Sequence, residues 1–211
     1  MHFDLKTERN KMICVAVTGG AGSGKSLVCR FFQELGAKTI SLDRLAREAV
    51  SPGSDAFDAI VEEFGNQVLD ANGQLDRSVL RRVITRDTEA KKRLEAITHP
   101  EIFRRLEREL DAISTESPDA VVVVEVPLLV ETGSQDRFDV VVLVETDEES
   151  QKQRIMARDG CSAQDAQDLI AAQALPWERR RHADYVIENI GGIDALKGRV
   201  GDVYRQICGV S

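Results

Sequence analysis

The sequence is poor in cysteine, and its cysteines are not paired. Among the 211 residues there are four, at Cys14, Cys29, Cys161 and Cys208, and no two of them form a C-x-x-C motif. This spacing favours neither a disulfide framework nor a zinc site. Cys14 and Cys29 fall in apolar segments, which predicts that both are small core residues. We therefore expect a protein of a reducing compartment, the cytoplasm.

The sequence also lacks an apolar run of the length that crosses a membrane, so no membrane partner is expected. Residues 1–11 are polar and have no apolar core like that of a secretory signal, so we expect them to form a loose extension. The chain contains neither an internal repeat nor a low-complexity segment. With 42% hydrophobic and 30% charged residues, residues 12–211 are expected to form a single domain with a substantial core.

An excess of positive charge is absent too, because the formal net charge is -8. Proteins that bind nucleic acid usually show a basic face, so this charge argues against that class of function. It does not argue against an anionic substrate, because a few local cations can outweigh the overall sign.

What the sequence does contain is a glycine-rich segment from Gly19 to Ser26, GGAGSGKS, which fits the phosphate-loop pattern G-x-x-x-x-G-K-[ST]. An apolar run at 12–17 precedes it and predicts a buried strand. Helical spacing follows from Leu27 to Leu35, and Gly36 predicts the end of that helix. A strand, a glycine loop and a helix in this order are the structural context that the pattern requires.

This context predicts how the segment binds phosphate. Glycines let backbone N–H groups turn toward phosphate oxygens, and the helix N-terminus adds partial positive charge. Lys25 would contact the β- and γ-phosphates, and Ser26 would offer its hydroxyl to Mg²⁺. The alternative is a glycine-rich turn that binds nothing, which the Lys-Ser pair and the flanking elements disfavour.

Further along the chain, apolar strands alternate with helical segments. The expected strands are 38–42, 120–126, 138–144 and 185–187, and the later expected helices are 147–158, 162–174 and 193–207. This alternation predicts an α/β fold with a doubly wound, mostly parallel β-sheet. Such sheets bind ligands at the carboxyl ends of their strands, where we expect Gly19, Asp43, Glu125 and Glu145. We also expect strand 38–42 to neighbour the first strand.

Residues 44–114 form a charged, helical region between the second and third strands. Within it, an interruption at 66–75 carries Asp70-Ala71-Asn72-Gly73, which predicts a turn. Asp76 and Asp87 each predict the start of a helix. His99-Pro100 is expected to end one helix and to begin the next, because proline suits the first helical position.

Two acidic residues are candidates for the chemistry. Asp43 ends the second strand and could accept the proton of an acceptor hydroxyl, or it could simply cap the helix that begins at Arg44. Glu125 interrupts an apolar strand and could reach Mg²⁺ through water, or it could simply reach solvent past the sheet edge. Beside a phosphate loop we favour function for Asp43.

Two arginines are candidates for a mobile lid at about 150–180. Arg154 and Arg158 lie four residues apart on one helix face, and Gly160 could act as a hinge. Such arginines would stabilise transition-state charge, and closure would exclude water. The alternative is a solvated charged face. Trp177, beside three arginines, could be a hinge with basic contacts to phosphate or a surface turn.

The motifs, taken together, resemble the dephospho-CoA kinase family. They are TGGAGSGKS, LDRLAREAV, GQLDRSVLRRVI, HP, VPLLVE, RIMARDG, AAQ and ADYVIEN, in the order seen in that family, and they extend from about Ile13 to Asn189. The resemblance implies transfer of the γ-phosphoryl group of ATP to the ribose 3′-hydroxyl of dephospho-CoA, the last step of coenzyme A synthesis. It also implies a P-loop kinase core, a helical acceptor-binding insertion and a helical lid.

The resemblance assigns residues to roles. The ATP phosphates would be held by Gly22, Ser23, Gly24, Lys25, Ser26 and Leu27, with Thr18 beside that loop. Asp43 matches the acid near the acceptor hydroxyl, and Arg154 and Arg158 match lid arginines. Asn189 and Gly191 lie where the adenine-side loop is expected. Arg77 and His99 match acceptor-region residues, although a histidine before proline at a helix junction is more often structural. Glu125 would lie near substrate and metal.

The chain departs from the family pattern at the end of the second strand. The family usually reads D-A-D there, whereas this chain reads Ser41-Leu42-Asp43 and keeps only the second acid. Many members carry aspartate at the position of Glu125, and a threonine at the position of Leu27. The segment after Gln173, with Pro176, Trp177 and its arginines, is also atypical.

Two other functions stay open from the residues alone. One is another P-loop small-molecule kinase that acts on a nucleotide or a sugar. The other is a non-catalytic ATP-binding switch, which the missing Asn-Lys-x-Asp guanine motif and the lid-like arginines disfavour. The sequence predicts neither the oligomeric state nor the acceptor contacts.

Overall fold

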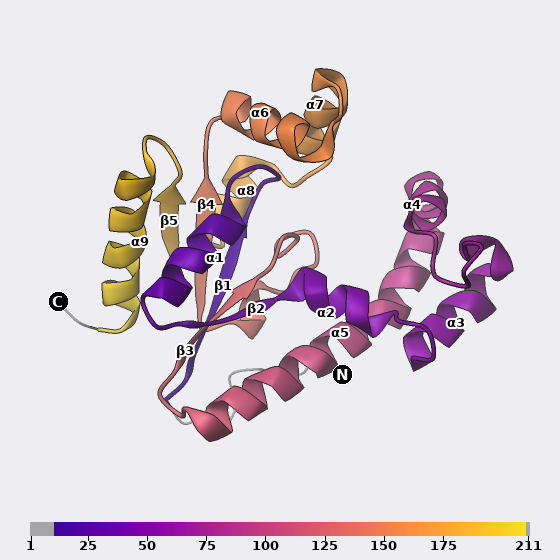
Figure 1. The fold of residues 1–211 in the computed structure, drawn as a ribbon, viewed down its shortest axis with the longest axis horizontal. Coiled ribbons are helices and arrows are strands. Elements are labelled where there is room, and N and C mark those ends of the chain that lie inside the picture. The colour runs from indigo at the N-terminus through magenta and orange to yellow at the C-terminus, as the bar shows by residue number, and fades with distance from the viewer. Residues whose placement is uncertain (1–10, 210–211) are drawn as a thin grey trace. The chain divides into compact units, whose positions relative to one another are not determined.

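The computed structural model describes residues 11–209, which divide into two compact units (Figure 1). Among these residues, the first unit contains 11–41 and 111–209, and the second runs from Leu42 to Leu110. Residues 1–10 of the expected N-terminal extension lie outside the described part, and the predicted domain boundaries stay predictions. Among residues 11–209, no helix combines the length and hydrophobicity that a membrane span requires.

The first unit is built on a five-stranded parallel sheet in the order β2-β3-β1-β4-β5. Its strands are β1 Ile13–Gly19, β2 Lys38–Ser41, β3 Val121–Glu125, β4 Val140–Glu145 and β5 Tyr185–Glu188. The expected α/β fold with a parallel, helix-connected sheet is therefore confirmed. Because all strands are parallel, their carboxyl ends meet at one edge, and Gly19, Glu125 and Glu145 lie there as expected.

The predicted neighbour of β1 was wrong. β2 pairs with β3, and β3 lies between β2 and β1. The reason is burial: Val122, Val123 and Val124 of β3 are 0% exposed, which suits a central strand, whereas Lys38 of β2 is exposed and suits an edge.

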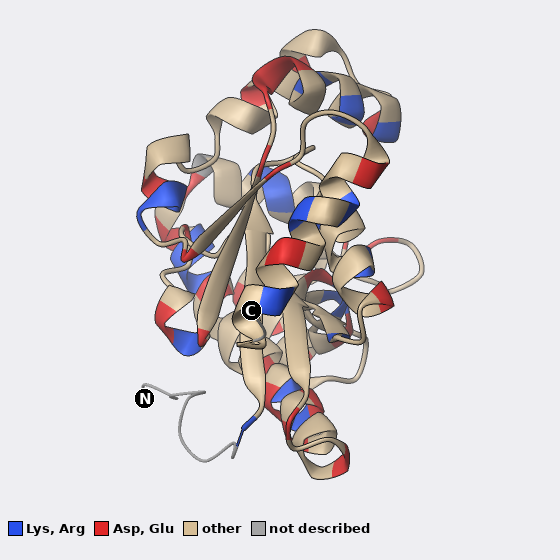
Figure 2. Cartoon of the chain, turned by 90° about the vertical axis from the view of Figure 1, so that its left-hand side faces the viewer, with Lys and Arg blue, Asp and Glu red and all other residues tan. Residues whose placement is uncertain are grey.

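The core of the first unit lies on the sheet face that two helices cover, α1 Lys25–Glu34 and α9 Ile193–Ile207. Side chains that alternate along the strands, such as Val15, Val17 and Val142, pack there against Phe32 of α1 and Leu196 of α9. The intervening strand residues are buried as well, so both faces are covered. Figure 2 shows the consequence: the strands are almost free of charged residues, which lie on helices and loops.

Between β4 and β5 the first unit carries α6 Glu148–Asp159, α7 Ala163–Ala171 and α8 Pro176–Arg180, and a 3-10 turn, η2 Gln135–Arg137, precedes β4. Asp147 caps α6 by accepting a 2.8 Å hydrogen bond from Ser150 N, and Ser162 caps α7 with a full capping box. Gly160 adopts φ 65° at the end of α6, where glycine is favoured. The helices expected at 147–158 and 162–174 are therefore present, the second ending at Ala171, but the short helix α8 was not predicted.

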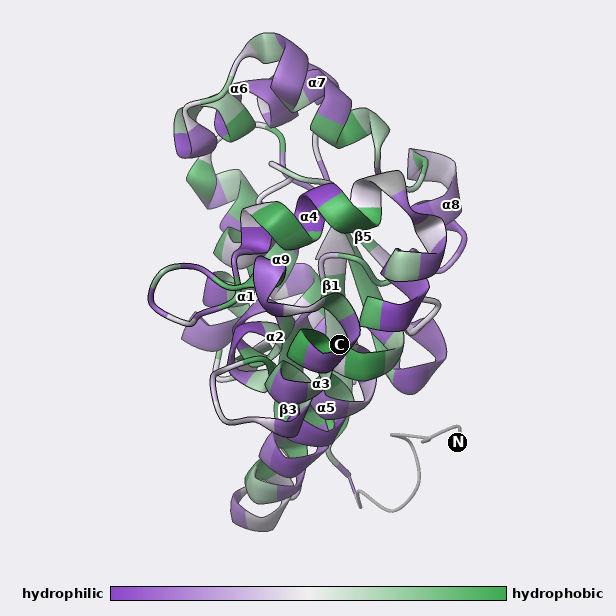
Figure 3. Ribbon diagram, turned by 90° about the vertical axis from the view of Figure 1, so that its right-hand side faces the viewer, coloured by the Kyte–Doolittle hydropathy of each residue, from purple (hydrophilic) through white to green (hydrophobic). Residues whose placement is uncertain are grey.

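The second unit is helical. It contains α2 Leu42–Ala49, α3 Asp55–Phe64, η1 Asn66–Val68, α4 Arg77–Arg86 and the first part of α5 Thr88–Glu116. Figure 3 shows hydrophobic and hydrophilic residues together on α4, as expected of a helix with one buried side. The buried members of its core are Ile60, Phe64, Val68, Leu80 and Ala90.

Local signals explain where these helices begin. Asp70 Oδ1 accepts hydrogen bonds from Asn72 N at 2.8 Å and Gln74 N at 2.9 Å, which forms the predicted turn. Asp76 caps α4, and Asp87 accepts from the first turn of α5, as predicted.

The predicted helix break at His99-Pro100 was wrong, because α5 continues through both residues. Proline removes the hydrogen bond to the carbonyl of Ala96, four residues earlier. Ala96 is exposed, so water can satisfy that carbonyl. Ile97 before the proline packs against an apolar cluster, and Leu106 after it is fully buried, which favours one continuous helix.

The local structure at Asp43 differs from both predictions made for it, the end of a strand and a helix N-cap. α2 begins at Leu42, so Asp43 lies in the first turn of the helix and is neither the end of β2 nor the N-cap. Its carboxylate is exposed, and its charge suits a helix N-terminus.

Candidate active site

The phosphate loop connects β1 to α1, as the glycine pattern predicts, and two of its glycines have a clear structural reason. Gly22 has φ 72°, and a Cβ atom there would lie 2.6 Å from the backbone oxygen of Gln151. Gly24 has φ 97°, and a Cβ atom there would collide with the amide of Asn189. Both positions therefore need glycine for the turn and for the close approach of α6 and of the segment after β5.

The N-terminus of α1 carries no side-chain cap in the described structure. Gly24 precedes the helix in a left-handed conformation, so the first-turn N–H groups of α1 are not capped by a neighbouring hydroxyl or carboxylate. A helix of ten residues with such an N-terminus suits an anionic ligand.

Lys25 lies across the loop. Its ammonium group donates hydrogen bonds to the carbonyl oxygens of Gly19 and Gly20, each at 2.9 Å. The charge is therefore held above the loop, near the backbone that would surround a phosphate group.

Ser26 and Glu125 meet at the carboxyl edge of the sheet. Ser26 Oγ, in the first turn of α1, donates a 2.7 Å hydrogen bond to Glu125 Oε1 at the end of β3. The structure thus brings together two residues that are 99 positions apart in sequence and that were both predicted to lie near a metal.

The two predicted lid arginines have different partners. Arg154 Nη1 donates to the carbonyl oxygens of Gly22 at 3.1 Å and Ser23 at 3.2 Å, so it contacts the loop. Arg158 forms two hydrogen bonds of 2.7 Å with the carboxylate of Asp159, its neighbour. The structure therefore brings Arg154 to the phosphate loop and pairs Arg158 with Asp159 on α6.

Asn189 also binds the carbonyl side of the loop. Its Nδ2 donates a 2.7 Å hydrogen bond to Ser23 O, while its own backbone oxygen accepts from Thr146 Oγ1 at 2.8 Å. Asn189 is only 7% exposed, and Gly191, two residues later, has φ 81°. Thr18, which the sequence placed beside the loop, is buried in β1.

Sequence reasoning assigned no individual role to two residues that contact the loop. Gln173, after α7, accepts a 2.9 Å hydrogen bond from Ala21 N through Oε1, and Arg179 Nη2 lies 3.4 Å from the same oxygen. Gln173 belongs to the AAQ motif, which contributed to the family resemblance but to which the sequence assigned no role. Arg179 stands among three consecutive arginines, and only the path of α8 shows which of them turns inward.

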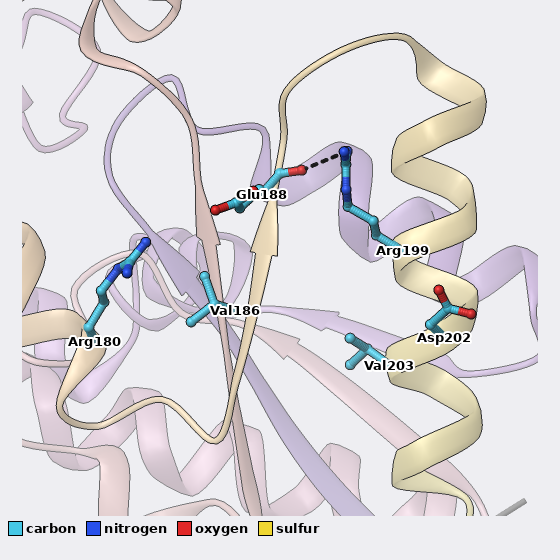
Figure 4. Close-up of a pocket in the computed structure, with 6 residues that line it drawn as sticks. All are labelled: Arg180, Val186, Glu188, Arg199, Asp202 and Val203. Atoms are coloured by element: carbon cyan, nitrogen blue, oxygen red, sulfur yellow. Dashed lines mark hydrogen bonds between the residues drawn. The ribbon is translucent and has the colours of Figure 1, made fainter. Parts of the chain in front are cut away.

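A surface pocket of about 330 Å³ opens between β5 and α9 (Figure 4). It is lined by Arg180, Val186, Glu188, Arg199, Asp202 and Val203. Arg199 donates a 3.1 Å hydrogen bond to the backbone oxygen of Glu188, and Arg180 pairs with Glu145 at the sheet edge. The charged residues that line this pocket have both signs, so the lining indicates no particular ligand.

Three predicted acceptor-side residues belong to the second unit. Asp43 is an exposed residue of α2, and Arg77 is the exposed first residue of α4. His99 packs edge-on against the ring of Phe103, with 6.4 Å between the ring centroids, one turn along α5. Their predicted roles toward the acceptor stay predictions.

Comparisons with known proteins agree with this geometry. The family model described as dephospho-CoA kinase (CoaE) matches residues 13–195. This chain belongs to the dephospho-CoA kinase family. A dephospho-CoA kinase of Geobacter sulfurreducens is 42% identical over 195 residues, which are 92% of this chain and 98% of that protein. The resemblance inferred from the motifs is therefore confirmed.

Two solved structures of the same size are similar to this fold. TT1252 from Thermus thermophilus is 33% identical with a TM-score of 0.81, and the match covers 93% of this chain and 98% of that one. Dephospho-CoA kinase from Campylobacter jejuni is 27% identical with a TM-score of 0.69, covering 94% and 98%. The family relation thus extends over nearly the whole chain.

Proposed function

We propose that this protein transfers the γ-phosphoryl group of ATP to the ribose 3′-hydroxyl of dephospho-CoA. The observation that carries the proposal is the family match across residues 13–195, in a chain whose phosphate loop is complete. In this proposal residues 12–211 form the kinase domain, 44–114 bind the acceptor and about 150–180 act as the lid.

The phosphate loop binds the triphosphate of ATP. Backbone N–H groups from Gly22 to Leu27 surround the phosphate oxygens, with Thr18 behind them, and Lys25 exchanges its carbonyl contacts for β- and γ-phosphate oxygens. Asn189 and Gly191 lie on the adenine side. The support is the glycine geometry of the loop and the position of Asn189 against Ser23.

The residues at the sheet edge fit a magnesium ion. Ser26 and Glu125 offer a hydroxyl and a carboxylate that are 2.7 Å apart, and no cluster of three or more His, Cys, Asp or Glu side chains that could hold a metal occurs among residues 11–209. Mg²⁺ suits such a site, because it is usually held by one or two carboxylates together with substrate phosphates. When bound, it neutralises charge on the β- and γ-phosphates.

The acceptor hydroxyl is oriented by Asp43, with Arg77 and His99 on the acceptor side. In the transfer, the acceptor oxygen forms a bond to the γ-phosphorus, and the bond to the β–γ bridging oxygen breaks with its electron pair leaving on ADP. The carboxylate of Asp43 takes the proton of the hydroxyl. Arg154 and Arg158 belong to the lid, whose closure excludes water from the reaction.

The compartment proposed for this reaction is the cytoplasm. None of the four cysteines forms a disulfide, and Cys14 and Cys29 are buried as predicted. Burial, followed by the negative charge of Glu125, raises the pKa of the Cys29 thiol, which therefore stays protonated and inert.

The test is a coupled assay of ADP production with and without dephospho-CoA. We expect ADP release that depends on dephospho-CoA, together with a product phosphorylated at the 3′-position. Phosphorylation of AMP, CMP or a sugar in place of dephospho-CoA would instead identify another small-molecule kinase. ATP binding without any acceptor-dependent release of ADP would identify a nucleotide switch.

A further inference from the structure

Three consecutive arginines at the end of α8 have three different environments. Arg181 is exposed and lies over the ring of Trp177, 5.9 Å from its centroid. Arg180 is exposed and ion-paired with Glu145, and it lines the surface pocket (Figure 4). Arg179 alone of the three is buried, at 8% exposure. The folded chain thus separates one arginine from two others of the same type.

Arg179 is a buried cation without a close anion. Among the described residues, no carboxylate lies within 4.0 Å of its guanidinium group, and its side-chain hydrogen bond is the 3.4 Å contact with Gln173 Oε1. The three acids that act on it from farther away are Glu131, Glu145 and Glu178. Each of them accepts a hydrogen bond from another group. Burying a guanidinium without a direct partner is costly, which points to an anionic ligand.

The guanidinium faces the phosphate loop. A Cβ atom placed on Gly20 would lie 3.2 Å from Arg179 Nη1 and 3.5 Å from Gln173 Oε1. Arg179 therefore packs against the same turn that carries Ala21, on the first unit alone.

Two donors converge on one oxygen at this point. Gln173 Oε1 accepts the N–H of Ala21 at 2.9 Å and lies 3.4 Å from Arg179 Nη2. A backbone N–H of a phosphate loop and a guanidinium that share one acceptor form the donor set of an oxyanion site. The amide oxygen of Gln173 marks where an anionic oxygen can be held.

We propose that Arg179 is a catalytic residue that binds the γ-phosphoryl group, and that Gln173 Oε1 holds the place of a phosphate oxygen until ATP arrives. The proposal rests on the proposed kinase function and deepens it. ATP displaces the amide of Gln173, after which Ala21 N–H and Arg179 donate to a γ-phosphate oxygen. As the γ-phosphorus passes from ADP to the acceptor oxygen, Arg179 stabilises the charge on its equatorial oxygens and takes no proton.

The experiment compares Arg179→Gln with the matched control Arg181→Gln in the full-length protein. Removing one preorganised donor to a transition-state oxyanion lowers kcat on the order of 10²- to 10³-fold, and we expect that loss for Arg179→Gln only. Titration calorimetry with ATP and with ADP, each with Mg²⁺, should show weaker binding of ATP and unchanged binding of ADP. Arg179→Lys should recover part of the loss, since it keeps the charge without the planar fork.

A merely structural Arg179 would give a different result. Arg179→Gln would then lower the melting temperature while leaving the ratio of ATP to ADP affinity as in the wild type, and that outcome overturns the proposal. If Arg179→Gln does not fold, the ratio of ATP to ADP affinity is measured on Arg179→Lys instead. Gln173→Ala removes the amide that ATP has to displace, so it should bind ATP at least as tightly as the wild type does. ATP binding weakened as much as in Arg179→Gln would contradict the displacement of Gln173.

Failure of this inference is distinguishable from failure of the proposed function. If wild-type protein releases no ADP in the presence of dephospho-CoA, the proposed acceptor is wrong. The comparison of ATP with ADP binding in wild type and Arg179→Gln needs no acceptor, so it still decides whether Arg179 recognises the γ-phosphate.

Discussion

The two units of this protein differ in the kind of contact that stabilises each of them internally. At the phosphate loop of the first unit, the contacts join distant parts of the chain: Ser26 to Glu125 across 99 positions, and Ser23 to Asn189 across 166. In the second unit many polar contacts are local, such as the cap of α4 by Asp76. The comparison shows that the candidate site depends on the sheet, which brings strand ends together, whereas the helical unit depends on caps and turns.

The difference extends to what the polar contacts contribute. Ion pairs of the second unit, such as Arg44 with Glu48 and Glu109, lie at the surface and stabilise it little. Its stability comes mainly from the apolar cluster around Ile60 and Phe64. In the first unit, Arg154 and Asn189 hold the carbonyl side of the loop, so we expect their loss to affect turnover more than stability.

The largest expected effect is that of Lys25→Ala in the first unit. Loss of the ammonium charge removes a preorganised partner of the transferring group, and we expect kcat to fall on the order of 10²- to 10³-fold or more. The measurement is steady-state ADP production. Lys197→Ala, which removes a surface ion pair with Glu34, is the control and should retain turnover. Normal turnover of Lys25→Ala would contradict the phosphate-loop mechanism.

Asp43→Asn tests whether a residue of the second unit contributes to turnover. If Asp43 accepts the acceptor proton, kcat should fall on the order of 10²-fold while ATP affinity stays as in the wild type. The matched control is Asp55→Asn, which changes another exposed acid in the first turn of a helix, α3. Equal turnover of Asp43→Asn and the wild type would show that the assigned base is wrong.

Ser54→Ala should act on stability alone. Ser54 caps α3 by accepting from Phe57 N at 3.2 Å, and it also donates to Ala49 O at 2.8 Å. Loss of an N-cap costs about 1 kcal/mol, or roughly 2–4 °C in melting temperature for a chain of this size. Thermal unfolding measures the shift, Ser54→Thr should restore most of it, and kcat should not change. A loss of turnover at unchanged stability would contradict the expectation that this cap contributes to stability and not to catalysis.

The smallest expected effect is on pH dependence. Hydrogen bonds from Ser78 and Val79 lower the pKa of the Asp76 carboxyl in the folded protein. Its stabilising contribution is therefore complete above the ordinary carboxyl pKa of about 4 and is lost as the pH falls through the lowered value. Asp76→Asn keeps a cap that does not titrate. The melting temperature should fall less between neutral and acid pH for Asp76→Asn than for the wild type. An equal fall in both proteins would exclude this carboxylate as a contributor to the pH dependence.

The sequence predicted the parts of the fold that depend on short-range chemistry. The glycine loop between β1 and α1, the caps at Asp147 and Ser162 and the turn at Asp70 depend on a few neighbouring residues, and each was recognisable. The order of the strands was not, because strand pairing depends on contacts between segments far apart in the sequence, such as β1 with β3.

The parts of the site that were missed depend on long-range packing. Pro100 locally predicts a helix boundary, yet α5 is continuous, with Ile97 packed against the apolar cluster before it and Leu106 buried after it. Arg179 is chemically identical to Arg180 and Arg181, and its burial follows from the path of α8. The pairing of Gln173 with Ala21 spans 152 positions, so no local pattern could indicate it.

The hydrogen bond from Asn189 to Ser23 has a consequence for synthesis on the ribosome. The loop leaves the exit tunnel first, but the side chain that holds its carbonyl follows 166 residues later. At bacterial and eukaryotic elongation rates this interval lasts roughly 8–30 s. During that time the nascent chain has the nucleotide motif without the downstream segment that shapes it, so tight ATP capture should begin only after the segment around Asn189 has been made.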